Sequence, residues 1–267
     1  MLLGVGGGAV VIKTNIFDLS GKVALVTTGG HGLGRAYCEA MAEFGADVAC
    51  TDISLDRAQE TVDLIKRFGH RTLAMEVDVS NLGQVEKMVK QTVDEFGTID
   101  ILFCNAGIGN PPGKLHEVPI EDWNKVLAVN LTGTFFCMRS VLPIMVQQKR
   151  GSIISTTSTA GLVAGAMPTA PYGATKAAII GLTKHAAVAY AKDGIRINAI
   201  APGGHETWPL GFPREEIEKI NKKMSEFIPM GRMGHPSEIK GLAVYLASDA
   251  SSYVTGQTFV EDGGYTA

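Results

Sequence analysis

Short apolar runs alternate with longer segments of helical spacing along most of this 267-residue chain. The apolar runs predict strands at Val23–Thr27, Asp47–Thr51, Thr72–Val77, Ile101–Asn105, Ser152–Thr156, Arg196–Ile200 and Thr258–Val260. The longer segments predict helices at Leu33–Phe44, Leu55–Phe68, Gln84–Phe96, Tyr172–Lys192 and, with looser periodicity, Glu121–Gln148. Because strands and helices of these lengths form βαβ units, we expect an α/β fold: a Rossmann-like, doubly wound parallel sheet with helices on both faces.

Composition supports a single domain and argues against a nucleic-acid partner. Hydrophobic residues make up 45% of the chain and charged residues 19%, which suits a single buried core rather than a disordered chain. The net charge of −3 provides no basic field for a nucleic-acid backbone. No charge block or low-complexity linker divides the sequence, so we expect an N-terminal extension at 1–20 and a single domain at 21–267.

The sequence gives no signal for a metal site or a membrane segment. Its four cysteines, Cys38, Cys50, Cys104 and Cys137, lack paired spacing and are expected to be small core residues. The histidines are not at ligand spacing, so no metal is expected. The apolar start, Met1–Ile12, lacks a basic region and falls short of the ~20 residues of a spanning helix. We therefore predict a cytoplasmic protein without membrane contact.

A glycine-rich segment, Thr27–Arg35, follows the first predicted strand and leads into the first helix. Glycines there allow a tight turn and a close approach of the backbone to a pyrophosphate, and the helix start directs free N–H groups at that anion. An ordinary turn between strand and helix is the alternative. If the segment binds a dinucleotide, the expected contacts are Thr27, Gly29, His31, Gly32, Leu33 and Gly34.

An acidic residue, Asp52, ends the second predicted strand, 52 − 34 = 18 residues after Gly34. A carboxylate there accepts hydrogen bonds from both hydroxyls of the adenosine ribose and repels a 2′-phosphate. The next residues, Ile53 and Ser54, offer no cation for such a phosphate. We therefore predict NAD rather than NADP, with Ile53 beside the ribose; a solvated loop aspartate is the alternative.

From about Gly21 to the C-terminus, the chain resembles the short-chain dehydrogenase/reductase family. Thr27, Gly32 and Gly34 fit its T-G-x-x-x-G-x-G loop, and Tyr172 and Lys176 fit its Y-x-x-x-K pair. The resemblance implies further cofactor contacts from Asp78, Val79, Asn105, Ala106, Gly107, Pro202, Gly203 and Thr207, with Tyr172 and Lys176 also at the cofactor. It also implies a homotetramer.

One position departs from the family pattern, because Thr28 occupies the place of the first loop glycine. A β-branched residue resists positive φ and adds bulk beside the pyrophosphate. We expect either a negative φ at Thr28 or weakened cofactor binding.

The candidate catalytic residues are Asn130, Ser158, Tyr172 and Lys176. Tyr172 and Lys176 are four residues apart on one helix face, so the lysine cation is expected to lower the tyrosine pKa by about 1–3 units and make it a general base. Ser158 would hold the substrate oxygen, and the resemblance implies that Asn130 holds a water in a proton path from Lys176. The alternatives are a packed tyrosine, a loop serine and a structural asparagine.

These features together predict hydride transfer between NAD(H) and a secondary alcohol or ketone. A similarity of Phe17–Val23 and the C-terminal third to sugar-acid and polyol dehydrogenases favours a polyol, sugar or sugar acid. Hydroxysteroid and 3-oxoacyl-thioester substrates stay open, as does a non-catalytic NAD(H)-sensing protein on the same fold. A substrate lid is expected at about 202–235, where His205 and Glu206 either touch the substrate or are solvated. Leu162, Val163 and Met167 are expected in the core or as an apolar wall.

Overall fold

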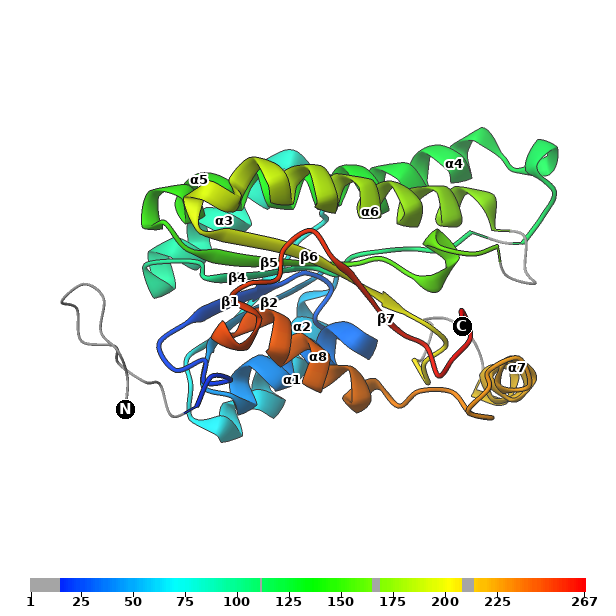
Figure 1. Ribbon diagram of the computed structural model, residues 1–267, viewed down its shortest axis with the longest axis horizontal. Coiled ribbons are helices and arrows are strands. Elements are labelled where there is room, and N and C mark those ends of the chain that lie inside the picture. Colours follow the sequence, from blue (N-terminus) through cyan, green and yellow to red (C-terminus); the bar gives the residue numbers. More distant parts are fainter. Residues whose placement is uncertain (1–14, 111, 165–168, 208–213) are drawn as a thin grey trace, which may run out of the picture.

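The described residues, 15–110, 112–164, 169–207 and 214–267 of a computed structural model, contain a seven-stranded parallel sheet of order β3-β2-β1-β4-β5-β6-β7 (Figure 1). The strands are β1 (Val23–Val26), β2 (Asp47–Asp52), β3 (Thr72–Glu76), β4 (Ile101–Cys104), β5 (Gly151–Thr156), β6 (Ile195–Pro202) and β7 (Thr258–Glu261). All neighbouring strands pair in parallel. The predicted doubly wound sheet is confirmed.

Helices cover both faces of the sheet (Figure 1). One layer holds α3, α4, α5 and α6, and the other holds α1, α2 and α8, while α7 lies near the C-terminus. Their bounds are α1 (Gly32–Glu43), α2 (Leu55–Ile65), α3 (Leu82–Phe96), α4 (Ile120–Val126), α5 (Gly133–Gln148), α6 (Ala170–Tyr190), α7 (Arg214–Ser225) and α8 (Lys240–Ala247).

Each layer packs its own hydrophobic cluster against the sheet. On the α1 side, Tyr37 stacks on Phe103 with ring centroids 4.6 Å apart. On the other side, Val141 and Met145 of α5 pack with Ile153 of β5. The four cysteines are free and buried, as predicted. The strands are therefore held from both faces, which fixes their carboxyl ends in space.

The long helix predicted at Glu121–Gln148 is confirmed as a continuous helical stretch, Ile120–Gln148, with a π-helical turn inside it. A π-helical segment, Leu127–Thr132, separates α4 from α5, and Pro143 lies inside α5. The stretch Ile120–Gln148 is long and apolar enough to span a membrane by length and composition alone, but α5 buries Cys137, Met138 and Met145 in the core. We therefore describe it as a core helix.

Candidate active site

The carboxyl ends of the strands bring the predicted site residues to one edge of the sheet. Chain order reverses between β1 and β4, which is where open α/β sheets form a crevice for ligands. The residues at or just after the strand ends are Thr27, Asp52, Asp78, Asn105, Ser158 and Pro202. Six different strands thus contribute to a single candidate site.

Thr27 joins the ends of β1 and β4. Its Oγ1 donates to the carbonyl of Phe103 (3.1 Å) and accepts from the N–H groups of Asn105 (2.9 Å) and Ala106 (3.2 Å). The side-chain amide of Asn105 donates from Nδ2 to the carbonyl of Thr28 (3.2 Å). These bonds hold the glycine-rich loop against the predicted N-A-G segment.

Thr28 adopts φ +51°, in the left-handed region. Of the two alternatives expected for Thr28, the negative φ is therefore excluded, and weakened cofactor binding remains a prediction. This conformation directs the Thr28 carbonyl at α1, where a Cβ on Gly34 would overlap it. Because the left-handed region is unfavourable for a β-branched residue, Thr28 carries local strain.

Replacing Thr28 with glycine is expected to raise the free energy of unfolding by about 0.5–1 kcal/mol, because relief of the left-handed strain exceeds the greater chain entropy of glycine. NADH affinity should not fall. Urea unfolding and NADH fluorescence titration measure the two effects. Lys149→Gly is the matched control, since Lys149 has φ +57° after α5, far from the loop. A less stable Thr28→Gly protein would contradict the strain argument.

The start of α1 is suited to an anion. His31 at its N-cap makes no side-chain capping hydrogen bond, whereas Ser54 and Asn81 cap α2 and α3. The first N–H groups of α1 are thus left for another acceptor, and the helix dipole favours negative charge there. Together with the glycine backbone, this arrangement fits the pyrophosphate of a dinucleotide.

Asp52 lies at the end of β2 with its side chain buried and crowded by donors. Oδ1 accepts from Arg57 Nη2 (2.7 Å) and Nε (3.1 Å) and from Ser54 N–H (3.1 Å). Oδ2 accepts from Gly30 N–H (3.2 Å) and lies 3.3 Å from His31 Nδ1. Burial acts to raise the pKa of Asp52, but His31, Arg57 and Ser54 outweigh it and lower the pKa to about 2. The carboxylate is held ionised.

Sequence reasoning missed Arg57. The two residues after Asp52, Ile53 and Ser54, carry no cation, but the start of α2 brings Arg57 back onto Asp52. The N-cap at Ser54 is the signal that could have found it, because the cap fixes the start of α2 and places Arg57 in its first turn, where its backbone N–H donates to Ser54 Oγ.

Three further predicted cofactor residues, Asp78, Val79 and Thr207, follow the carboxyl ends of β3 and β6. Asp78 Oδ1 accepts from Ser80 N–H and Oγ, and Val79 packs where a Cβ on Gly133 would lie. Thr207 contacts the glycine loop, since a Cβ on Gly32 would be 3.3 Å from its Cγ2. The segment after β6 therefore lies next to the loop after β1.

Ser158, Tyr172 and Lys176 meet beside this crevice. Ser158, which follows β5 and caps a short turn at Thr159–Gly161, lies close enough to the Tyr172 phenol to lower its pKa. Lys176 is buried, with Nζ 5.5 Å from the centroid of the Tyr172 ring. Its Nζ donates to the carbonyl of Thr156 (2.7 Å). The predicted helical pairing of Tyr172 and Lys176 on one face of α6 agrees with this geometry.

The expected lowering of the tyrosine pKa is wrong for the protein alone. Burial raises the pKa of Tyr172 above its usual value, and the hydrogen bond from Ser158 opposes only part of that rise. Burial also lowers the pKa of Lys176 to about 8, so this lysine loses its proton more readily than an exposed lysine. Desolvation, which depends on tertiary packing, outweighs the cation that the sequence spacing suggested.

Asn130 lies in the π-helical segment with its side chain buried. Oδ1 accepts from Ile108 N–H (2.8 Å), and Nδ2 donates to the Ile108 carbonyl (3.0 Å) and to Thr175 Oγ1 (3.1 Å). The Asn130 side chain therefore connects the loop after β4 to α6. A Cβ on Gly107 would lie 3.2 Å from Lys176 Nζ and 3.7 Å from Asn130 Oδ1, so the three residues are neighbours.

The residues predicted near the substrate differ in their exposure to solvent. His205 is buried and bonded to Glu261, so it is neither solvated nor an open substrate contact. Leu162 and Val163 are exposed, so their expected place in the core is wrong and the apolar wall remains. Met167 lies outside the described residues.

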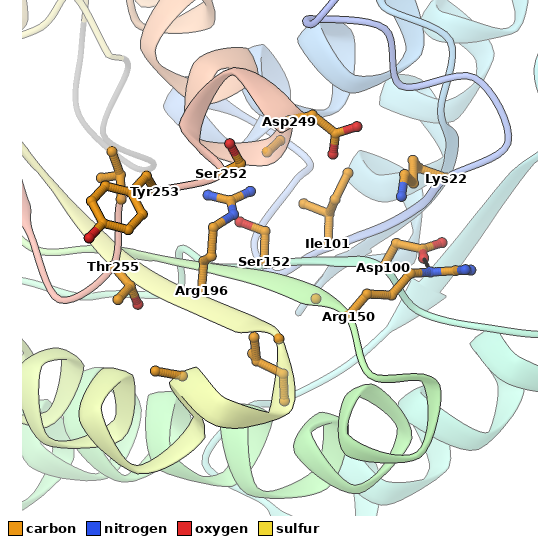
Figure 2. Close-up of a pocket in the computed structure, with 16 residues that line it drawn as sticks. Lys22, Asp100, Ile101, Arg150, Ser152, Arg196, Asp249, Ser252, Tyr253 and Thr255 are labelled. Atoms are coloured by element: carbon orange, nitrogen blue, oxygen red, sulfur yellow. Dashed lines mark hydrogen bonds and ion pairs between the residues drawn. The ribbon is translucent and has the colours of Figure 1, made fainter. Parts of the chain in front are cut away.

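A cavity of about 580 Å³ lies at the opposite, amino-terminal edge of the sheet (Figure 2). Lys22, Arg150 and Arg196 line it, with Arg150 Nε bonded to Asp100 (2.8 Å). Arg196 donates to Ser251 Oγ and to the Ser248 carbonyl. These bonds fasten the starts of the strands, so we assign the cavity a structural role.

Fold and site together define a dinucleotide-dependent oxidoreductase. A family profile described as enoyl-(acyl carrier protein) reductase matches residues 28–266. Cyclohexanol dehydrogenase of an Acinetobacter species is 37% identical over 96% of this chain and 98% of its own. Cis-4-hydroxycyclohexanecarboxylate dehydrogenase of Sinomonas cyclohexanicum is 37% identical, covering 92% and 97%. A short-chain type dehydrogenase/reductase from Mycobacterium marinum superposes with a TM-score of 0.89 at 38% identity, covering 94% and 98%. The chain belongs to the short-chain dehydrogenase/reductase family, which uses a nicotinamide cofactor.

Proposed function

We propose that this oxidoreductase transfers a hydride between NAD(H) and a secondary alcohol or ketone, with Tyr172 as its acid–base group. The observation that carries the proposal is the grouping of Tyr172, Ser158 and the buried Lys176, with Lys176 Nζ 5.5 Å from the centroid of the Tyr172 ring. Ser158 positions the substrate oxygen, and Tyr172 takes the hydroxyl proton or returns it. The bound nicotinamide supplies the hydride acceptor or donor, and its oxidised form adds a positive charge that favours phenolate.

Lys176 and Asn130 support the proton transfer. Lys176 places a cation near the tyrosine ring, which offsets part of the cost of a buried phenolate. Asn130 keeps the loop after β4 in register with α6 through Ile108 and Thr175. Its role in a water path from Lys176 stays a prediction. A sensing protein would not require this set of groups.

Asp52 favours NAD, because its ionised carboxylate repels a 2′-phosphate. We expect kcat/KM with NAD to exceed that with NADP at least about tenfold, a difference of about 1.4 kcal/mol. Asp52→Asn should reduce this ratio at least about fivefold by removing the charge while keeping the shape. Asp56→Asn, at an exposed position in the first turn of α2, is the matched control. A wild-type preference for NADP would refute the assignment and would identify Arg57 as a phosphate ligand.

For the substrate, we propose a ring-bearing secondary alcohol. The exposed Leu162 and Val163 follow Ser158 within five residues and offer an apolar surface, and two relatives are named for cyclohexane alcohols. The polyol, sugar or sugar-acid prediction remains a second class, and a relative in Synechocystis named 3-oxoacyl-[acyl-carrier-protein] reductase keeps the thioester class in the comparison. The homotetramer, the cytoplasmic location and the division at residue 20 remain predictions.

Initial rates with cyclohexanols, polyols, sugar acids, hydroxysteroids and 3-hydroxyacyl esters test the proposal. Each compound is assayed with NAD and with NADP, and Tyr172→Phe provides the blank. Activity on cyclic alcohols that disappears in the variant supports the proposal. Binding of NADH without turnover of any class would favour a sensing protein instead.

A further inference from the structure

His205 lies where the two ends of the lid segment meet. His205 and Gly234 form an isolated parallel β-bridge, in which Gly234 N–H donates to the Gly204 carbonyl (2.9 Å) and Glu206 N–H donates to the Gly234 carbonyl (2.8 Å). The chain leaves the sheet after Pro202 and returns to this point at Gly234. We call residues 203–207 together with Gly234 the lid base.

The imidazole of His205 has an acceptor at each nitrogen. Nδ1 lies 3.2 Å from the carbonyl oxygen of Gly203, and Nε2 lies 3.0 Å from Oε2 of Glu261 on β7. A neutral imidazole carries one N–H and would leave its other nitrogen facing a lone pair. The imidazolium donates to both partners. The geometry therefore selects the charged form, in a side chain that is only 3% exposed.

Close packing fixes the ring as well as its hydrogen bonds. A Cβ on Gly234 would lie 2.9 Å from two ring atoms, so the ring lies directly on that glycine. On one side of the lid base, Gly203 packs on Asp262; on the other side, Thr207 packs on Gly32 of the glycine loop. His205 thus stands between β7 and the segment that reaches the predicted nicotinamide position.

We propose that His205 is a positioning residue that acts as an imidazolium: its ion pair with Glu261 holds the lid base, and with it Gly203 and Thr207, in the conformation that binds the cofactor. No sequence motif signalled this pair. The role goes beyond the proposed reaction, because it concerns how the cofactor segment is held rather than which substrate is turned over.

The charged groups around His205 determine how this clamp responds to pH. Glu261 faces the ring from β7, and Glu238 adds its charge from the short helix at Pro236–Ile239 while it is bonded to Arg232. Burial acts to lower the pKa of His205, but the hydrogen bond and charge of Glu261 outweigh it and raise the pKa above 6.5. When folding raises the pKa of a histidine, the stabilisation is complete at pH values below the pKa of the unfolded chain. It is lost as the pH rises through the pKa of the folded protein. The lid base should loosen in alkaline solution.

Direct titration tests the protonation state. In the wild-type protein, NMR of ¹³C-labelled histidine, with the His205 signal assigned from its absence in His205→Asn, should give a pKa above 6.5. In Glu261→Gln, which keeps an acceptor but loses the charge, that pKa should fall. A wild-type value at or below 6.5 would overturn the proposal. This experiment needs no cofactor, so it is independent of the proposed reaction.

NADH affinity tests the positioning role. We expect Glu261→Gln to raise the NADH dissociation constant about three- to tenfold at pH 6.5 and less than twofold at pH 9, with a larger effect on that constant than on kcat. His70→Asn, just before β3 at the far edge of the sheet, should leave the pH dependence intact. An equal loss at both pH values would indicate packing alone and would overturn the proposal, as would unchanged affinity. If Glu261→Gln does not fold, the wild-type NMR titration still decides.

Discussion

Replacing Tyr172 with phenylalanine is expected to lower kcat by about 10²–10⁴-fold, the usual contribution of a positioned acid–base group. Phenylalanine keeps the ring that packs near Lys176, so the site retains its shape and loses only the hydroxyl next to Ser158. NADH affinity should change less than about threefold, because the hydroxyl contributes little to dinucleotide binding compared with the glycine loop. Steady-state rates and a fluorescence titration measure the two quantities.

Tyr190→Phe is the matched control for this experiment. Tyr190 ends the same helix and packs against the core cluster beneath α5, away from Ser158. The control should retain kcat within about twofold. If Tyr172→Phe keeps more than a tenth of wild-type activity, another group carries the proton, and the proposed role of Tyr172 is wrong.

Replacing Gly34 with alanine is expected to lower the free energy of unfolding by about 3 kcal/mol, at the upper end of ordinary overpacking costs. The added Cβ would overlap the Thr28 carbonyl and lie 2.7 Å from Nδ2 of Asn105. Neither group can move easily. Thr28 is held in the turn, and the backbone N–H of Asn105 donates to Thr27 Oγ1. NADH binding should also fall, because the loop must move for the methyl group to fit. Urea unfolding and fluorescence titration report the two losses.

Gly181→Ala distinguishes this clash from a general effect of replacing a helical glycine. Gly181 lies inside α6, and a Cβ there would meet nothing within 4 Å. Alanine at this position should stabilise the protein by about 0.5–1 kcal/mol through helix propensity. A Gly34→Ala protein as stable as the wild type would show that the glycine loop adapts, contrary to the packing described above.

Much of the fold was predictable because its signals are local. Buried parallel strands are short apolar runs, and the helices α1, α2 and α3 each carry an apolar stripe that a window of sequence shows. The helix α8 was missed because its eight residues are apolar on most sides and start without a side-chain cap. The π-helical turn between α4 and α5 was not predicted, because such a turn has no marked composition.

The candidate site was predictable where spacing alone determines proximity. Tyr172 and Lys176 face the same side because they are four residues apart on a helix. The ionisation of Tyr172 was not predictable, since it depends on how deeply the folded protein buries the phenol. Arg57 on Asp52 and Glu261 on His205 were missed for a similar reason: a turn and a distant strand bring these charges into place.

The lid base separates residues 206–233 from the strands of the sheet. Because His205 and Gly234 bring the two ends of residues 206–233 together, an insert of different length or sequence can start and finish there without moving β6 or β7. Exchanging residues 206–233 between relatives is therefore expected to change substrate selectivity while Tyr172 and Lys176 stay in place on α6.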